Sequence, residues 1–171
     1  MDQRHGRGTG LLVFSIIRSR VEWKAYEPAR DKIRGARAKQ ENLGTRIGVV
    51  GGSGCGKTHL ARQLSASLGA PMFSSDDLIA THDWSGASRE IADQWLPRPG
   101  PWIQEGIALP RALRKWLASH PEGKPLDTLI VLTKPHRPQT PGQATQAKGH
   151  DTVLSEILPE LRRRGVVIEH R

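Results

Sequence analysis

The sequence predicts a three-layer α/β domain with a five-stranded parallel sheet over residues 45–171, preceded by a basic N-terminal extension over residues 1–44. Two observations support this fold class. From residue 45 onward, short apolar runs of strand length alternate with longer segments of helical periodicity, and this alternation is typical of parallel sheets with helical crossovers. The length of 171 residues suits one domain of ordinary size with a buried core.

The first strand and the helix after it are clearly patterned. Residues 47–50 (IGVV) form a short apolar run, which fits a buried parallel strand. Residues 57–68 follow as a helix, because leucines recur at four-residue steps and Gly69 stands where a helix would end. These leucines are Leu60, Leu64 and Leu68.

The next elements are shorter or less regular. Residues 71–77 (PMFSSDD) predict a second strand that ends in carboxylates, and residues 83–96 predict a weakly patterned helix. Residues 101–106 (PWIQEG) predict the third strand. Pro110 suits the first turn of the helix that follows. The apolar side chains expected on the buried face of that helix are Leu109, Leu113, Trp116 and Leu117.

The last third of the chain is predicted to hold two strands and a helix. Residues 127–133 (DTLIVLT) form the clearest strand, and residues 134–150 are a polar connection long enough to suggest a lid. Asp151 or Thr152 is expected to cap a final helix, which Pro159 should kink or shorten. Residues 166–169 (VVIE) then close the sheet. The apolar face of the final helix consists of Leu154, Ile157, Leu158 and Leu161.

Charge and cysteine content limit the classes of function. A formal net charge of +9 favours polyanionic partners such as nucleotides or nucleic acid, although it can also serve solubility alone. One cysteine, Cys55, excludes an intramolecular disulfide and a multi-cysteine metal site. No apolar run approaches the roughly 20 residues of a membrane helix. Residues 11–17 are apolar but lack a following cleavage pattern, so we expect a cytoplasmic protein.

The stretch between the first strand and the first helix carries the clearest chemical signal. It matches the pattern G-x-x-x-x-G-K-[ST] in full, in the strand–turn–helix context that the pattern requires. Its glycines let backbone N–H groups converge on an anion, and the next helix adds the positive end of its dipole. We expect ATP here, with Lys57 on the β and γ phosphates and Thr58 on Mg²⁺. The expected nucleotide-binding residues are Gly51, Gly52, Ser53, Gly54, Cys55, Gly56, Lys57 and Thr58.

From Arg46 to its end the chain resembles the small P-loop kinases, which include nucleoside-monophosphate, shikimate and gluconate kinases. The stretches GGSGCGKT, FSSDDLI (73–79) and WIQEGIALPRALR (102–114) carry this resemblance. It implies a P-loop NTPase fold with strand order 2-3-1-4-5 and an ATP- and Mg²⁺-dependent phosphotransferase. A GTPase fits less well, because in LIVLTKPH (129–136) His136 replaces the aspartate of the guanine-recognition sequence.

Two neighbouring carboxylates are candidates for the acceptor side. Shikimate- and gluconate-type kinases carry an acidic element at this position, where both aspartates are expected to bind the acceptor. Asp77, the first choice as catalytic residue, or Asp76 can orient an attacking hydroxyl or take its proton. An equally good interpretation, which does not exclude the first, is structural: Ser74 or Ser75 together with Asp76 could start a helix. Ala80 replaces the arginine of the monophosphate kinases, which weighs against a nucleoside-monophosphate acceptor.

Four further residues receive predicted roles. Glu105 is expected to hold the water shell of Mg²⁺, or else to be a plain carboxylate at a strand end. Arg111 is expected to bind the acceptor, or to be a surface arginine. In the predicted lid, Arg137 and, as second choice, Lys148 are expected to neutralise charge during transfer, unless the segment is a solvated loop.

The function that these residues predict is transfer of the γ-phosphoryl group of ATP to a small hydroxyl-bearing acceptor or nucleotide. The alternative is a nucleotide-binding ATPase module that engages nucleic acid through the basic residues 1–44 and the arginines 162–164. An acceptor at the end of a polynucleotide would combine both. The sequence leaves the acceptor and the oligomeric state open.

Overall fold

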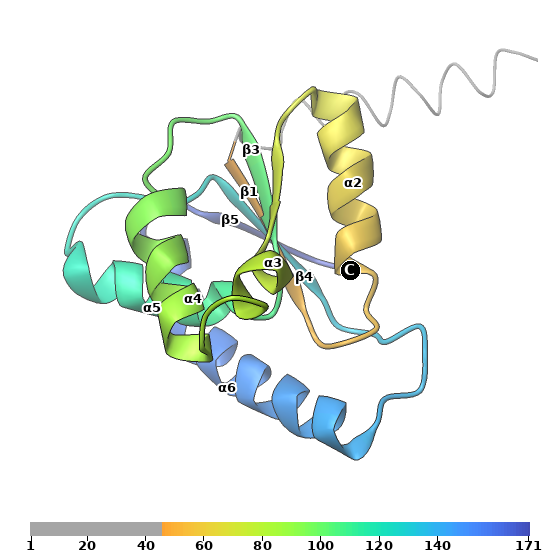
Figure 1. Cartoon of the computed structure of the whole chain (residues 1–171). Coiled ribbons are helices and arrows are strands. Elements are labelled where there is room, and N and C mark those ends of the chain that lie inside the picture. Colours follow the sequence, from red (N-terminus) through yellow and green to blue (C-terminus); the bar gives the residue numbers. More distant parts are fainter. Residues whose placement is uncertain (1–45) are drawn as a thin grey trace, which may run out of the picture. The chain divides into compact units, whose positions relative to one another are not determined.

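The computed structural model describes residues 46–171, and the predicted extension over residues 1–44 lies outside this part of the chain. Its centre is a five-stranded, all-parallel sheet with the strand order β2-β3-β1-β4-β5 (Figure 1). The predicted α/β class and strand order are therefore confirmed. The strands are β1 (Arg46–Gly51), β2 (Met72–Ser74), β3 (Trp102–Glu105), β4 (Thr128–Leu132) and β5 (Val167–His170).

Helices connect the strands, as parallel pairing requires. The crossover from β2 to β3 is the most divided one, since it contains two short helices and a π-helical turn. The helical elements are α2 (Lys57–Leu68), α3 (Ser75–Ile79), α4 (Trp84–Glu90), the π-helical turn η1 (Ile91–Trp95), α5 (Leu109–Ser119) and α6 (Pro141–Arg163).

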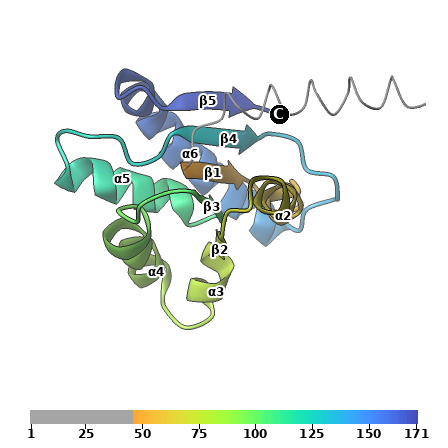
Figure 2. The same cartoon turned by 90° about the horizontal axis from the view of Figure 1, so that it is seen from above.

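Helices and sheet form three layers (Figure 2), and the sheet separates two apolar clusters. On one face, Ile47 and Val49 of β1 pack with Ala61 and Leu64 of α2. Side chains alternate across a strand, so Val50 of β1 joins the cluster on the other face. Fully buried side chains of β4, α5 and α6 in that second cluster are Leu129, Leu109, Leu113 and Leu161.

The second strand and its following helix differ from the prediction. β2 ends at Ser74 rather than at Asp77, because the Ser74 hydroxyl accepts a hydrogen bond from the Asp76 N–H at 3.4 Å and caps α3. The helix-start interpretation of this stretch is thus confirmed. The helix predicted over 83–96 is capped by Asp83 but divides into α4 and η1.

The predicted lid over residues 134–150 is the largest correction. α6 begins at Pro141, ten residues before Asp151, so more than half of the expected loop is helical. Thr140 and Gln143 form a capping box, and Pro141 occupies the first turn, where its missing N–H costs nothing. Neither Asp151 nor Thr152 caps the helix, which also continues through Pro159 to Arg163.

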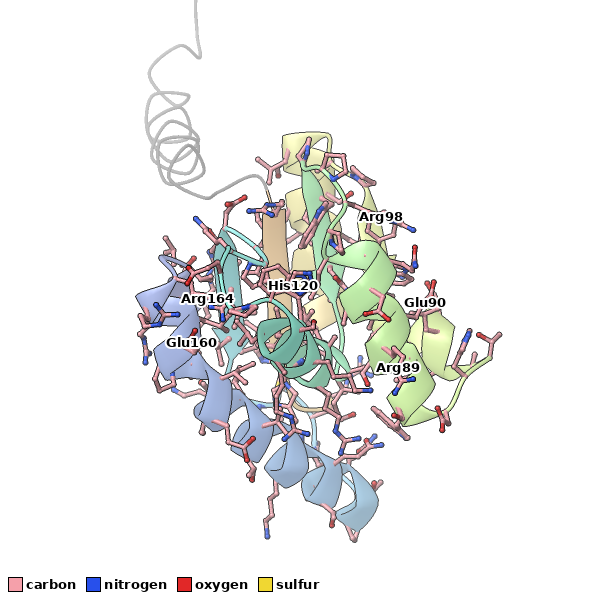
Figure 3. All side chains as sticks on the ribbon, turned by 90° about the vertical axis from the view of Figure 1, so that its left-hand side faces the viewer. Arg89, Glu90, Arg98, His120, Glu160 and Arg164 are labelled. Carbon is pink, nitrogen blue, oxygen red and sulfur yellow. The ribbon has the colours of Figure 1, made fainter. Side chains whose placement is uncertain are left out.

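Arg164 fastens the end of α6 to the end of α5 (Figure 3). Its guanidinium donates to the backbone oxygens of His120 at 2.6 Å and Gly123 at 3.3 Å. It also pairs with Glu160 on its own helix at 2.7 Å. Carbonyls at the carboxyl end of a helix attract cations, and the Arg164 side chain is only 6% exposed, so this arginine is structural.

Candidate functional site

The loop between β1 and α2 lies at the carboxyl edge of the central strand, where ligands of open parallel sheets bind. Gly51 has no room for a side chain, because a Cβ there would lie 2.6 Å from the Leu132 backbone oxygen of β4. Gly56 caps α2 with a φ of 83°, a left-handed conformation that favours glycine. The sequence pattern therefore coincides with a backbone that requires glycine.

Lys57 folds back over this loop. Its ammonium donates a hydrogen bond to the Gly52 backbone oxygen at 2.9 Å, so the charge lies beside the loop. Lys57, Ser53 and Asp76 line the same cavity of about 240 Å³. The structure thus brings a cation of the loop and a carboxylate of α3 to one site.

Glu105 ends β3 behind the loop and is fully buried. Its Oε1 accepts hydrogen bonds from Ser74 Oγ at 2.6 Å and from Thr58 Oγ1 at 3.2 Å. Its Oε2 has no hydrogen-bond partner among the described residues, which is costly for a buried carboxylate oxygen. The parallel register places Glu105 opposite Val49 and Ser74, so strand pairing fixes this position.

The donor set fits a magnesium ion bound together with phosphate. Mg²⁺ in nucleotide sites takes one or two protein oxygens and completes its shell with phosphate and water. Thr58 supplies a hydroxyl, and Glu105 supplies a buried carboxylate with one unpartnered oxygen. Within residues 46–171, no group of three or more His, Cys, Asp or Glu side chains could hold a metal ion by itself.

Of the two candidate carboxylates, Asp76 lines the 240 Å³ cavity and Asp77 does not, although both begin α3. This cavity shares Trp84, Ile107 and Gln146 with a larger cavity of about 580 Å³. The larger cavity lies against α6 and the start of α5, and its remaining lining residues are Arg111, Gly142, Thr145, Gly149 and His150.

Arg111 is exposed and lines this larger cavity. Its guanidinium carbon lies 5.7 Å from the centre of the Trp84 ring, a distance at which a cation and an aromatic face attract. The predicted acceptor-binding arginine therefore lies beside an aromatic ring of α4, in a cavity that shares lining residues with the cavity of Lys57 and Ser53.

The two predicted lid residues lie in different places. Arg137 belongs to the short segment before α6, and this segment is hydrogen-bonded to the loop between β1 and α2: the His136 N–H donates to the Gly54 oxygen at 3.0 Å. Gln139 Nε2 likewise donates to the Ser53 oxygen at 2.6 Å. Lys148 is exposed on α6 and lines neither cavity.

His150 is a site residue that sequence reasoning missed. Its buried Nε2 accepts a hydrogen bond from the Gly51 N–H at 3.2 Å, and its Nδ1 lies 3.0 Å from Asp151 Oδ1. Burial lowers the pKa of His150, Asp151 opposes this shift, and Lys57 adds to it. With α6 starting at Pro141, the spacing of His150, Val153, Leu154 and Ile157 would have placed this histidine on the buried face.

Cys55 lies inside the loop and is buried. Burial raises the pKa of its thiol, while Lys57 and the Gly52 backbone oppose this shift. Low thiolate character makes a thiol a poor nucleophile.

No protein-family model matches the sequence, and no curated protein matches it. Over residues 46–171, none of the helices combines the length and the apolar character that crossing a bilayer needs. The protein is thus an α/β domain whose loop between β1 and α2 requires glycine. A lysine, two hydroxyls and two carboxylates gather at the same edge of the sheet, namely Lys57, Thr58, Ser74, Asp76 and Glu105.

Proposed function

We propose that this protein is an ATP- and Mg²⁺-dependent phosphotransferase of the small P-loop kinase type, which transfers the γ-phosphoryl group to a hydroxyl of a small acceptor. The observation that supports it best is the shared cavity of Lys57, Ser53 and Asp76, which joins a phosphate-binding group to a candidate base. That cavity shares lining residues with a second, larger one, which offers room for an acceptor.

Residues 51–58 bind the triphosphate in this proposal. The backbone N–H groups at the amino end of α2 and the helix dipole attract the phosphates. The Lys57 ammonium leaves the Gly52 oxygen and contacts the β and γ phosphates, where it neutralises charge that grows during transfer.

Thr58 and Glu105 would hold the magnesium ion. The ion, when bound, would neutralise the charge on the phosphate oxygens. Thr58 would supply its hydroxyl oxygen, and the Glu105 carboxylate, which Ser74 keeps in place, would supply negative charge beside it.

Asp76 orients the accepting hydroxyl and takes its proton. As the hydroxyl oxygen bonds to the γ phosphorus, the bond between that phosphorus and the β–γ bridging oxygen breaks, and ADP leaves. We assign this role to Asp76 rather than to Asp77, because Asp76 lines the cavity that Lys57 also lines. Arg111 binds the remainder of the acceptor in the larger cavity.

Arg137 is our choice for the cation that neutralises charge during transfer. The segment that carries it contacts Ser53 and Gly54, so a small movement of this segment would bring the exposed guanidinium over the loop. Lys148 is also an exposed cation, but it remains the second choice because it lines neither cavity.

A screen for ADP production with Mg²⁺, ATP and a panel of hydroxyl-bearing and nucleotide acceptors tests this function. Lys57→Ala should abolish the activity and weaken ATP binding. Arg62→Ala, which removes an exposed cation from the same helix, should change neither. Full phosphotransfer activity in the Lys57→Ala protein would refute the proposal.

The alternative, an ATPase module that engages nucleic acid, has less support in the described residues. Of the three consecutive arginines, Arg163 and Arg164 pair with Glu160, and Arg164 is almost completely buried. The other basic segment, residues 1–44, lies outside the described part of the chain. Nucleic-acid binding with a steep salt dependence that disappears on deletion of residues 1–42 would favour this alternative.

A further inference from the structure

His150 connects the two halves of the proposed site. It lies on α6 and lines the 580 Å³ cavity, while its Nε2 accepts the hydrogen bond from the N–H of Gly51, the last residue of β1. Gly51 also stands opposite Leu132 of β4. The His150 side chain therefore forms part of the wall of the proposed acceptor cavity and also contacts the first residue of the proposed phosphate loop.

The bond pattern defines the protonation state of His150. Nε2 accepts a hydrogen bond from Gly51, so it carries no proton. The ring proton is then on Nδ1, and this N–H donates a hydrogen bond to Asp151 Oδ1. The ring is neutral in this arrangement, and its side chain is only 1% exposed. A second proton would have to enter on Nε2, and it would break the bond to Gly51 and leave that buried N–H without its acceptor.

Charged and titratable groups surround His150 on several elements. Asp151 on α6 favours a charged ring, and Lys57 on α2 disfavours it. Arg111 on α5 lines the same cavity, and the Cys55 thiol is buried in the loop that Gly51 begins. Burial and the charge of Lys57 together lower the pKa of His150, against the opposing effect of Asp151.

We propose that His150 is a positioning residue: in its neutral form it holds the Gly51 N–H and fixes the start of the phosphate loop in the shape that accepts a nucleotide. Protonation releases Gly51 and places a cation in the wall of the acceptor cavity. This inference rests on the proposed function, since it assumes that the loop binds a triphosphate.

Three variants of the full-length protein test the proposal. His150→Gln keeps an acceptor but cannot be protonated at that atom, and His150→Phe keeps a flat ring but offers no acceptor. His59→Gln, at an exposed histidine of α2, is the matched control. The readouts are the dissociation constant of the Mg²⁺ complex of a non-hydrolysable ATP analogue and the amide ¹H–¹⁵N shift of Gly51, both from pH 8 to pH 5.

Near pH 8, the His150→Gln and His59→Gln proteins should bind the analogue as the wild type does, and His150→Phe should bind it about tenfold more weakly. On acidification the wild type should lose affinity relative to His150→Gln. The ratio of the wild-type and His150→Gln dissociation constants at each pH cancels the effect of nucleotide protonation, which is the same for both proteins. The Gly51 amide shift should change over the same pH range in the wild type and stay constant in His150→Gln.

A constant ratio together with an unchanging Gly51 shift would overturn the role of His150 while leaving the proposed function intact. A wild type that binds no nucleotide analogue even at pH 8 would instead overturn the proposed function and, with it, this inference. If His150→Phe does not fold, the comparison between the wild type and His150→Gln decides the matter alone.

Discussion

The hydroxyl of Ser74 and the carboxylate of Glu105 form a hydrogen bond of 2.6 Å between the ends of two neighbouring strands. The same hydroxyl accepts from the Asp76 N–H, so one side chain connects the proposed metal ligand to the helix that carries the proposed base. Thr58 donates to the same oxygen of Glu105. Three elements of the chain, α2, β2 and β3, therefore fix the position of one buried carboxylate.

We predict that Glu105→Gln reduces the contribution of magnesium to nucleotide binding. The amide oxygen can still accept from Ser74 and Thr58, but the negative charge that faces the metal is lost. The strengthening of ATP-analogue binding by Mg²⁺ should fall about 10- to 100-fold, measured by calorimetric titration with and without the metal. Glu122→Gln, at an exposed position, should behave as the wild type. Equal dependence on Mg²⁺ in both variants would argue against the assignment.

We predict that Asp76→Asn and Asp77→Asn differ in catalysis. Both carboxylates are exposed in the first turn of α3, so the two variants lose the same charge at the same helix end. Only Asp76 lines the cavity with Lys57, and kcat should therefore fall about 10²- to 10⁴-fold in Asp76→Asn alone. Steady-state assays with the acceptor found in the screen measure this. A larger loss of kcat in Asp77→Asn than in Asp76→Asn would assign the role of base to Asp77 instead.

Arg164 and Arg163 offer a comparison of stability. Both pair with Glu160, but the Arg164 side chain is only 6% exposed and donates to the backbone oxygens of His120 and Gly123, which follow α5, whereas the Arg163 side chain is 61% exposed. Arg164→Ala should lower the free energy of unfolding by about 1–3 kcal/mol, because two backbone oxygens and a carboxylate lose a donor whose side chain is buried. Arg163→Ala should have a smaller effect, because an exposed ion pair contributes little to stability. Urea unfolding of both variants measures the difference, and equal losses would contradict the structural role of Arg164.

Asp127 should make stability depend on acidic pH. Burial by itself raises the pKa of Asp127, but hydrogen bonds and charge from Arg46, with help from Lys124, lower it to about 2 from an ordinary value of 3.8. The folded-state pKa lies below the unfolded one, so the stabilisation is present above pH 3.8 and is lost as the pH falls toward 2. The shift corresponds to about 2 kcal/mol.

Asp127→Asn should accordingly lower the free energy of unfolding by about 2 kcal/mol at pH 7, with a smaller difference from the wild type at pH 3. Unfolding by urea at the two pH values provides the measurement. Asp93→Asn, which removes an exposed carboxylate, is the control. A deficit of the same size at both pH values would mean that the ion pair with Arg46 does not produce the effect.

The lid segment shows where sequence reasoning fails. Hydrophobic periodicity detects a helix that packs along its length, but residues 141–149 of α6 face solvent or a cavity and carry few apolar side chains. The start signal was nevertheless present locally, as Thr140, Pro141 and Gln143 form a capping box with proline in the first turn. The polarity of the segment outweighed that signal in the prediction.

The sequence by itself determined the class of fold, the bounds of the helix 57–68 and the loop that precedes it, because periodicity, glycine placement and strand alternation act over a few residues. The tertiary structure decided which carboxylate lines the cavity beside Lys57 and that His150 accepts from Gly51, 99 residues away. Contacts of this range depend on how α3 and α6 pack on the sheet. The free energy of that packing is distributed over the whole core, so a local stretch of sequence does not reveal it.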